Sequence, residues 1–341
     1  GEPGSADKDD PADGGSTAMA NGPAGGGGVP LVIYDTDMGP DIDDALALAM
    51  LHSYQKLGMV ELAAVTVSRS SVDGARYSDA VNTFYGRPDI PIGINRKNPP
   101  YYDDRVFYPA LANSWPNDVA TQPIEDAYKL QRRVLADARA NGRSVLLIQT
   151  GFSGNVSQLL DSPGDEISPL NGIDLVRATV PLFSIMAGSI ELGIAEFNIE
   201  KEIGPARNVF AKWPGRLAMS PFELGNAITY PYRAIRDELN WVARHPVREA
   251  YEFNDLDWHV DAPPFYDMRS WDLTSVIEAV EPDADYFLTS TTGKVQVDAT
   301  GRTRFQPGQG QHYVLDRAKQ YSAKQRQRVV DRMIELVSMR P

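Results

Sequence analysis

Hydrophobic positions are almost absent from the first part of the chain and regularly spaced in the rest. Residues 1–28 contain no Val, Ile, Leu or aromatic residue, whereas Val29–Tyr34 is an apolar run with the length of a strand. From Ile42 to Tyr54 apolar residues recur at helical spacing, and Glu61–Val67 is a second strand-length run. The folded part of the chain is therefore predicted to begin with a β–α–β unit.

Short strands and helices continue to alternate beyond this unit. Further strands are predicted at Ile90–Ile94, Ser144–Gln149, Ala178–Ile185 and Arg216–Met219. Helices are predicted at Val72–Tyr85, Glu125–Asn141, Asn155–Leu160, Ala227–Ala243 and Asp316–Ser338. Asp285–Phe305 contains two Thr-Gly turn signals and predicts antiparallel strands. We expect one α/β domain over residues 29–341, with a mostly parallel open sheet flanked by helices and a few late antiparallel strands.

Composition restricts the chemistry that this domain can perform. The chain has 33 Lys and Arg against 46 Asp and Glu, and a net charge of −13 argues against nucleic acid or an anionic membrane surface as a partner. The lack of cysteine excludes disulfides, thiolate metal sites and cysteine nucleophiles. No run approaches the ~18 apolar residues of a membrane-spanning helix. The chemistry must come from carboxylates, amides, hydroxyls, four histidines or a metal.

Residues 1–28 are interpreted as a disordered linker or leader outside the fold. They consist mainly of Gly, Ala, Pro, Ser and Asp, and bury too little apolar surface to offset the entropy of ordering. Such a segment is consistent with a tether left after removal of a signal peptide, in an exported periplasmic or lipid-tethered protein. It is equally consistent with an ordinary disordered terminus of a cytoplasmic protein.

Five carboxylates follow the first predicted strand within ten residues, at Asp35, Asp37, Asp41, Asp43 and Asp44. Acids gathered at the carboxyl end of a parallel strand repel one another unless a cation neutralises them. Because the available ligands are oxygens, a hard cation is expected, with Ca²⁺ favoured over Mg²⁺. This motif is the strongest indication of function in the chain.

Three simpler interpretations account for only part of the acidic motif. Acids in the first turn of a helix stabilise its dipole, which explains Asp43 and Asp44 but not the remaining three. An EF-hand loop requires Gly where Pro40 stands and Glu where Leu46 stands. A phosphatase of the haloacid-dehalogenase type also begins with a strand and Asp-x-Asp, but it gives no reason for the later acids.

At this motif the sequence resembles the inosine–uridine-preferring nucleoside hydrolase family, a subgroup of which opens with Asp-Thr-Asp-x-Gly-x-Asp-x-Asp-Asp. Three later segments extend the resemblance. Thr150-Gly-Phe-Ser-Gly-Asn155 is similar to the family's Thr-Gly-Pro-Leu-Thr-Asn segment. Ala195-Glu-Phe-Asn198 matches its Ala-Glu-Phe-Asn segment, and Trp271-Asp272 aligns with its His-Asp pair.

The resemblance implies a nucleoside-hydrolase-like α/β fold with a bound Ca²⁺, a small-molecule ribosyl substrate and a homo-oligomer. It implies Asp37 as the general base, which accepts a proton from a water whose pKa the ion lowers. The implied metal ligands are Asp37, Asp44, the Gly154 carbonyl and Asp272, together with a water and two ribose hydroxyls. The implied substrate-binding residues are Asp43, Glu196, Asn198, Asp272, Met186 and Trp271.

The sequence departs from the family pattern at several positions. Trp271 stands where the family has a histidine that helps protonate the departing base, and an indole cannot transfer protons. Ser70 or Arg69 replaces an asparagine near the end of the second strand. The asparagine that binds the ribose 2′-hydroxyl has no counterpart, and Glu191 or Ser189 are candidates to compensate for it.

The segment Pro221–Trp271 is rich in aromatic residues and proline and predicts long loops over the site. It offers His259 and Asp261 as candidates for a substitute acid, although a histidine in such a loop is more commonly structural. The remaining histidines have no motif around them. Aromatic residues that could stack on a base or pack the loops are Tyr230, Tyr232, Trp258, Phe265 and Tyr266.

The predicted function is Ca²⁺-dependent hydrolysis of the N-glycosidic bond of a ribonucleoside or related ribosyl compound, giving base and ribose. Trp271 leaves open a non-catalytic protein that binds ribose or nucleoside with Ca²⁺. A third hypothesis is a Mg²⁺-dependent phosphohydrolase that uses Asp35 and Asp37.

Overall fold

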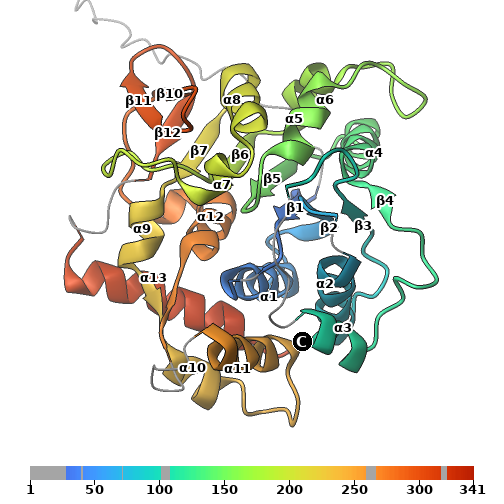
Figure 1. Cartoon of the computed structure of the whole chain (residues 1–341), viewed down its shortest axis with the longest axis vertical. Helices are drawn as coiled ribbons and strands as arrows, with labels where there is room; N and C mark the ends of the chain where they lie inside the picture. Colours follow the sequence, from blue (N-terminus) through green and yellow to red (C-terminus); the bar gives the residue numbers. More distant parts are fainter. Residues whose placement is uncertain (1–27, 40, 71, 101–107, 259–265, 316–320) are drawn as a thin grey trace, which may run out of the picture.

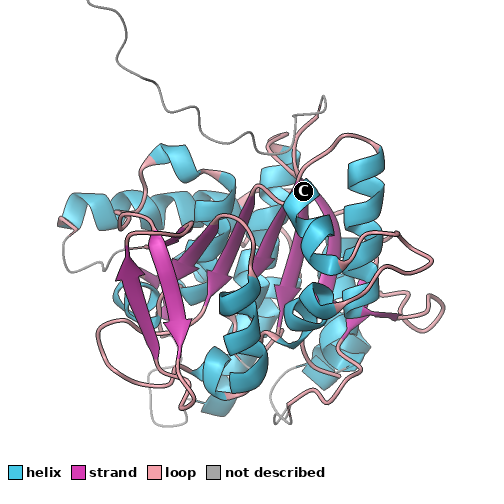
Figure 2. Ribbon diagram, turned by 90° about the horizontal axis from the view of Figure 1, so that it is seen from above, coloured by secondary structure: helices cyan, strands magenta, loops and turns pink. Residues whose placement is uncertain are grey.

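The computed structural model describes residues 28–39, 41–70, 72–100, 108–258, 266–315 and 321–341. Its centre is a ten-stranded sheet with the strand order β11-β10-β12-β7-β6-β5-β1-β2-β3-β4 (Figures 1 and 2). The strands are β1 (Leu31–Thr36), β2 (Glu61–Val67), β3 (Ile92–Ile94), β4 (Glu125–Asp126), β5 (Val145–Gln149), β6 (Leu182–Met186), β7 (Leu217–Ser220), β10 (Gly293–Val297), β11 (Thr303–Pro307) and β12 (His312–Val314).

The sheet confirms the predicted fold class. Strands from β12 to β4 pair in parallel, and the late strand β10 pairs antiparallel with both β11 and β12. All six residues of β1 are buried, as expected of a central parallel strand covered on both faces. Alternation along β1 sends Val32 and Tyr34 into one hydrophobic core and Leu31 and Ile33 into the other.

Helices cover both faces of the sheet (Figure 2). On one face lie α1, α2, α12 and α13, and on the other lie α4, α5, α6 and α8. The helices are α1 (Asp43–Lys56), α2 (Val72–Phe84), α3 (Tyr108–Ser114), α4 (Ala127–Ala140), α5 (Gly154–Asp161), α6 (Gly172–Thr179), α7 (Phe197–Glu200), α8 (Ile203–Lys212), α9 (Phe222–Ala227), α10 (Tyr232–Glu238), α11 (Pro246–Trp258), α12 (Trp271–Val280) and α13 (Ala323–Ser338), with a 3₁₀ turn at Pro282–Ala284.

The segment Pro221–Trp271, which leads into α12, was predicted to form long loops. The structure shows helices and strands there instead. It contains the helices α9, α10 and α11 and a small two-stranded antiparallel sheet of β8 (Thr229–Tyr230) and β9 (Met268–Arg269). Of the predicted helix Ala227–Ala243 only Tyr232–Glu238 (α10) is helical, because Pro231 follows the strand β8 and forms the N-cap of α10. The predicted strand Ala178–Ile185 begins only at Leu182, because Thr179 still belongs to α6.

Some sequence predictions fall on residues that the structure does not describe. The leader lies almost entirely within residues 1–27. The candidate acids His259 and Asp261 and the candidate stacking residue Phe265 lie within residues 259–265. Within the described ranges, every helix falls short of the length or the hydropathy that a bilayer crossing requires.

Candidate active site and metal centre

The acidic motif forms the turn between β1 and α1, at the carboxyl edge of the sheet. Met38 and Gly39 both have positive φ, at 30° and 104°, and reverse the chain there. The Thr36 hydroxyl donates to Asp44 Oδ1 at 2.5 Å and accepts the Met38 N–H at 2.9 Å. The Gly39 N–H points at Asp44 Oδ2, at 3.4 Å. These contacts fix the Asp44 carboxylate at the first turn of α1.

Asp272, in the first turn of α12, lies beside this turn although it is far from it in the sequence. Its backbone N–H donates to Asp43 Oδ2 at 3.2 Å, so the start of α12 lies against the start of α1. Oxygen atoms of Asp43, Asp44 and Asp272 lie within 4.8 Å of one another, and all three residues are buried. Among the described residues no other group of three acids or histidines comes this close.

Burial and mutual repulsion make the carboxylates of this cluster a favourable environment for a cation. Burial raises the pKa of Asp37, Asp43 and Asp272 well above the usual carboxyl range, and the neighbouring aspartates raise it further. Arg69 partly opposes this shift at Asp37, and its guanidinium donates to the Asp37 carbonyl at 3.4 Å. Asp272 Oδ2 is buried without a hydrogen-bond partner. An oxygen-rich, desolvated donor set with an unpartnered carboxylate oxygen fits a hard divalent cation.

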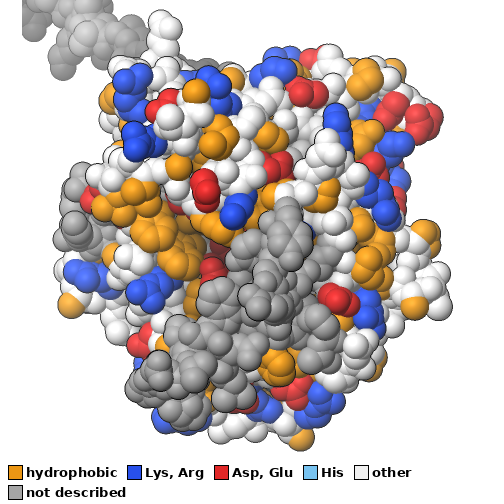
Figure 3. Space-filling model, in the orientation of Figure 1, with side chains coloured by type: hydrophobic (Ala, Val, Ile, Leu, Met, Phe, Trp, Pro, Cys, Tyr) orange, Lys and Arg blue, Asp and Glu red, His pale blue; other side chains and the backbone are white. Residues whose placement is uncertain are grey.

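The cluster forms the floor of a cavity of about 100 Å³. A single water needs only about 10–15 Å³ of such space, so the cavity can take an ion together with several polar groups of a ligand. Red acidic side chains are visible in a hollow near the centre of the face in Figure 3, beside hydrophobic side chains. The cavity is lined by Asp37, Gly39, Asp41, Asp43, Asp44, Thr150, Met186, Glu196, Phe197, Asn198, Phe222, Trp271 and Asp272.

Thr150 and Asn198 form the wall of the cavity at the ends of β5 and β6. The Thr150 hydroxyl lies 3.3 Å from Asp44 Oδ1, and the Asn198 amide donates to the carbonyls of Thr150 and Met186 at 3.0 Å each. Gly151 allows the close approach of this wall to the acidic turn. A Cβ at Gly151 would lie 2.4 Å from the Asp37 backbone nitrogen.

Glu196 is the N-cap residue of α7 and lies beside Asn198. Its two carboxylate oxygens accept the N–H groups of Gly188 and Asn198, each at 2.8 Å. Burial raises its pKa to about 7 in spite of these bonds. Both residues of the predicted sugar-binding segment therefore line the cavity in positions fixed by hydrogen bonds.

Trp271 and Phe222 form the aromatic part of the cavity. Their rings stack with centroids 5.5 Å apart, and Trp271 Nε1 donates to the Phe222 carbonyl at 3.0 Å. Gly225 of α9 packs directly on the backbone of Trp271, since a Cβ at this position would lie 2.5 Å from the Trp271 Cα. The indole is thus held in place by its ring face, its N–H and its backbone.

The structure does not bring Gly154 to the acids, so its predicted role as a carbonyl ligand is not supported. Gly154 is the first residue of α5 and lines a separate hollow with Gln158 and Glu202. Its carbonyl accepts from the Gln158 side chain at 3.0 Å. The physical reason is that β5 ends at Gln149, so the residue at the sheet edge is Thr150, and the chain has left the edge four residues later.

Asp35 does not line the cavity either. It points to the opposite face of the sheet, where its carboxylate accepts from Thr66, Gln131 and Asn155 at 2.6–3.0 Å. Burial raises its pKa to about 7. This placement removes the support for a phosphohydrolase that uses Asp35 and Asp37 together.

Several further candidates from the sequence lie away from the cavity. Ser189 and Glu191, considered as replacements for a ribose-binding asparagine, do not line it. Tyr230 and Tyr232 are buried in the hydrophobic core, as is most of Tyr266. Three histidines are buried without access to the cavity, and burial lowers the pKa of His52 and His245 to about 3 and of His312 to about 4.

Sequence reasoning missed Phe197, Phe222 and Thr150 as cavity residues. Phe197 lies between the two predicted sugar-binding residues, and Thr150 directly follows a predicted strand. The available signal was the carboxyl end of β5 for Thr150 and the place between Glu196 and Asn198 for Phe197. Phe222 follows β7 in the same way, after Pro221.

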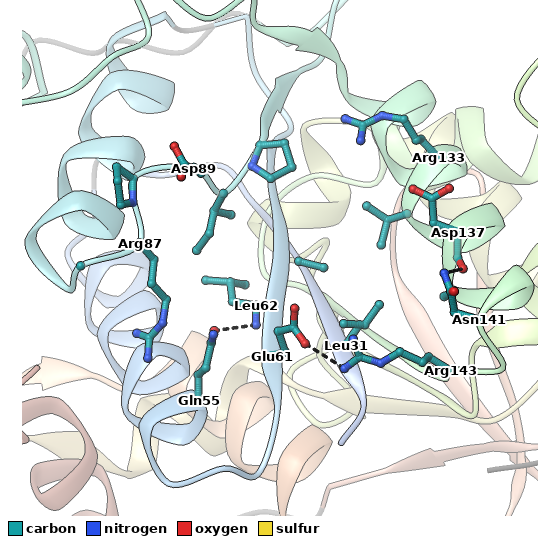
Figure 4. A pocket seen from close by; sticks show the side chains of 17 residues that line it. Leu31, Gln55, Glu61, Leu62, Arg87, Asp89, Arg133, Asp137, Asn141 and Arg143 are labelled. Atoms are coloured by element: carbon teal, nitrogen blue, oxygen red, sulfur yellow. Dashed lines mark hydrogen bonds and ion pairs between the residues drawn. The ribbon is translucent and has the colours of Figure 1, made fainter. Parts of the chain in front are cut away.

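A second hollow, of about 540 Å³, lies at the opposite edge of the sheet, where β1 and β2 begin (Figure 4). One ion pair lies within its lining, and one lining arginine binds a glutamate outside it. Glu61 binds Arg143 at 2.9 Å, and Arg133 binds Glu125 nearby. This hollow is larger than the acidic cavity but lacks a cluster of potential metal ligands among the described residues, so the acidic cavity is the candidate active site.

Comparisons with known proteins agree with the fold described above. The family model for the inosine-uridine preferring nucleoside hydrolase matches residues 32–335. A plant nucleoside hydrolase superposes with a TM-score of 0.69 at 18% identity, covering 91% of this chain and 99% of its own. The enzyme titled inosine-uridine preferring nucleoside hydrolase from Bacillus anthracis gives 0.66 at 15% identity, covering 91% and 99%.

The same fold is found in a protein described as an effector. The type III effector protein XopQ, solved in complex with adenosine diphosphate ribose, superposes with a TM-score of 0.61 at 13% identity, covering 91% of this chain and 93% of its own. At such low identities the likeness shows a common fold. No curated protein matches by sequence.

Proposed function

The chain belongs to the inosine-uridine preferring nucleoside hydrolase family, and on this premise we propose that it hydrolyses the N-glycosidic bond of a ribonucleoside or related ribosyl compound. The products are a base and ribose. The observation that carries the proposal is the buried cluster of Asp43, Asp44 and Asp272 on the floor of a cavity that also contains Asp37 and Asn198.

The donor set supports Ca²⁺ as the resident ion. Asp37, Asp44 and Asp272 would hold it, with the carbonyl of Thr150 in place of the one predicted at Gly154. When bound, the ion lowers the pKa of a water molecule and binds sugar hydroxyls. Without a cation, the desolvated carboxylates repel one another, as their raised pKa values indicate.

Residues of the chain then perform the proton transfer and hold the sugar. Asp37 is the proposed general base, which takes the proton of the attacking water. Asp43, Glu196 and Asn198 are proposed to bind ribose hydroxyls, with Met186 and Trp271 against the sugar and base. Positive charge that develops on the ribose in an oxocarbenium-like transition state is stabilised by the surrounding carboxylates.

Trp271 favours a second candidate function. An indole cannot supply a proton to a departing base, and its N–H is occupied by the Phe222 carbonyl. A Ca²⁺-dependent protein that binds a ribosyl compound without cleaving it would need no such proton. The XopQ fold neighbour, solved with adenosine diphosphate ribose, is a precedent for binding of a ribosyl compound.

Two measurements on the same preparation separate these functions. Release of reducing sugar from a panel of ribonucleosides, with Ca²⁺ and with a chelator, tests hydrolysis. Calorimetric titration with ribose and with the same nucleosides tests binding. Turnover that requires the ion supports the hydrolase, and Ca²⁺-dependent binding without sugar release over hours supports the binding protein. Neither turnover nor binding would contradict both.

A further inference from the structure

Asp35 belongs to the acidic motif, but its side chain lies on the face of the sheet opposite the cavity. Its Oδ2 accepts three side-chain donors, from Thr66 at 2.6 Å, Gln131 at 3.0 Å and Asn155 at 2.8 Å. All four residues are fully buried, and Asp35 Oδ1 has no hydrogen-bond partner. A single carboxylate oxygen thus connects the end of β1 to β2, α4 and α5.

The bond to Asn155 closes the turn between β5 and α5. The backbone carbonyl of Asp35 accepts the Thr150 N–H at 2.8 Å, at the first residue of this turn. The carboxylate of Asp35 accepts the Asn155 amide, at the second residue of α5. Asp35 therefore holds both ends of the segment Thr150–Asn155 against the end of β1.

This segment packs against the acidic turn from which the general base is proposed to act. Gly151 lies so close that an added Cβ would be 2.4 Å from the Asp37 backbone nitrogen. The Thr150 hydroxyl lies 3.3 Å from Asp44 Oδ1, and its carbonyl accepts the Asn198 amide at 3.0 Å. A shift of the segment would therefore move the proposed carbonyl ligand of the ion together with a proposed sugar ligand.

We propose that Asp35 is a positioning residue for the reaction. Through Asn155 it sets the Thr150 carbonyl and Gly151 against the acidic turn, and so fixes the place of the ion relative to Asp37. This inference rests on the proposed hydrolase function and assigns a role in it to a residue that does not line the cavity. The partners behind a metal ligand are often worth about 10–100-fold in metal affinity or activity, because they orient the ligand.

Thr66 provides a matched control for the bond from Asn155. It donates to the same oxygen of Asp35, but it also lies opposite Asp35 in the parallel pairing of β1 and β2. The backbone bonds of these strands already fix its position, so loss of its hydroxyl should weaken the fold without moving the segment Thr150–Asn155. Asn155 belongs to α5, outside the sheet, and its side chain connects this segment to β1.

The experiment compares Asn155→Ala with Thr66→Val at a temperature where both variants are folded. Calorimetric titration with Ca²⁺ alone measures the affinity for the ion, and steady-state kinetics with a ribonucleoside at saturating Ca²⁺ measures kcat and KM. Thermal melts in a chelator should show a lower melting temperature for both variants. We expect Asn155→Ala to weaken Ca²⁺ binding and to lower kcat, each by at least about 10-fold. Thr66→Val should retain the affinity and the kcat of the unaltered protein.

Two results would overturn the proposal. Asn155→Ala may lose as much stability as Thr66→Val yet retain its Ca²⁺ affinity and kcat, and Asp35 would then be purely structural. Equal losses of affinity and kcat in both variants would show that they follow from a general weakening of the fold.

If Asn155→Ala does not fold, Asp35→Asn replaces it, because it keeps the size of the side chain and one oxygen for the three donors. We expect it to lower kcat at saturating Ca²⁺, and an unchanged kcat overturns the proposal. Failure of the unaltered protein to cleave any ribonucleoside refutes the hydrolase function. The Ca²⁺ titration of Asn155→Ala against Thr66→Val then still decides whether Asp35 positions the ligands of the ion.

Discussion

The backbone N–H of Asp272 donates to Asp43 Oδ2 at 3.2 Å and joins residues 229 positions apart in the sequence. This bond brings the first turns of α12 and α1 together, and it places the unpartnered Asp272 Oδ2 beside the acidic turn. A ligand that binds both helices should therefore stabilise the fold as well as the site.

Ca²⁺ is expected to raise the melting temperature, because it binds the folded cluster and not the unfolded chain. At a concentration of 100 times Kd the gain in the free energy of unfolding is about 2.7 kcal/mol. In Asp272→Asn this gain should be largely lost, since the variant removes one anionic ligand. Differential scanning calorimetry with Ca²⁺ and with a chelator measures both. Asp283→Asn, on the exposed turn after α12, is the matched control and should respond as the unaltered protein does.

Gly151→Ala is expected to reduce activity at least about 10-fold, because the new methyl group would lie 2.4 Å from the Asp37 backbone nitrogen and 2.5 Å from Ser68 Oγ. The acidic turn must shift, and small displacements of a catalytic group are costly. Gly204→Ala, with no atom within 4 Å of its added methyl group, is the control and should retain activity. Full activity and full Ca²⁺ affinity in Gly151→Ala would contradict the assigned position of Asp37.

Asn198→Ala should lower kcat/KM by about 10–100-fold, because it leaves the carbonyls of Thr150 and Met186 without their donor and removes a proposed sugar ligand. Steady-state kinetics and a thermal melt separate loss of binding from loss of fold. Asn208→Ala, which removes a comparable amide from α8 outside the cavity, serves as the control. An unchanged KM and kcat in Asn198→Ala would exclude a role in the reaction.

Glu278 in α12 is expected to make stability fall as pH rises. Burial raises its pKa from 4.5 to about 7, in part opposed by the Tyr313 hydroxyl, which donates to it at 2.7 Å. A raised pKa in the folded state stabilises the protein fully below pH 4.5, and this contribution is lost as pH approaches and passes about 7. The total is at most about 3 kcal/mol.

The glutamine variant tests this directly. Glu278→Gln keeps an acceptor for Tyr313 but cannot ionise, so the free energy of unfolding should depend less on pH than in the unaltered protein. Urea unfolding at a series of pH values, with a chelator present in every sample, gives the difference between the two proteins. Parallel curves over this range would show that Glu278 titrates normally in the folded state.

The local elements and the acidic motif were predictable, because they depend on short-range patterns. The β–α–β opening, the parallel sheet and the late antiparallel strands follow from strand-length apolar runs and turn residues. The helices before α12 were not predictable from the sequence. Pro231 and Pro246 divide this aromatic-rich stretch into separate helices, and their arrangement depends on tertiary packing rather than on short-range patterns. Motif alignment placed the carbonyl ligand at Gly154, whereas the end of β5 brings Thr150 to the cavity.

A crystal structure with Ca²⁺ and ribose, in the unaltered protein and in Asp272→Asn, tests the central claim most directly. The account predicts one ion in the unaltered protein, bound by Asp37, Asp44 and Asp272 at about 2.3–2.6 Å and by two ribose hydroxyls. It predicts a weakly occupied or vacant position in Asp272→Asn. An ion bound elsewhere, or ribose held in the cavity without any ion, would contradict it.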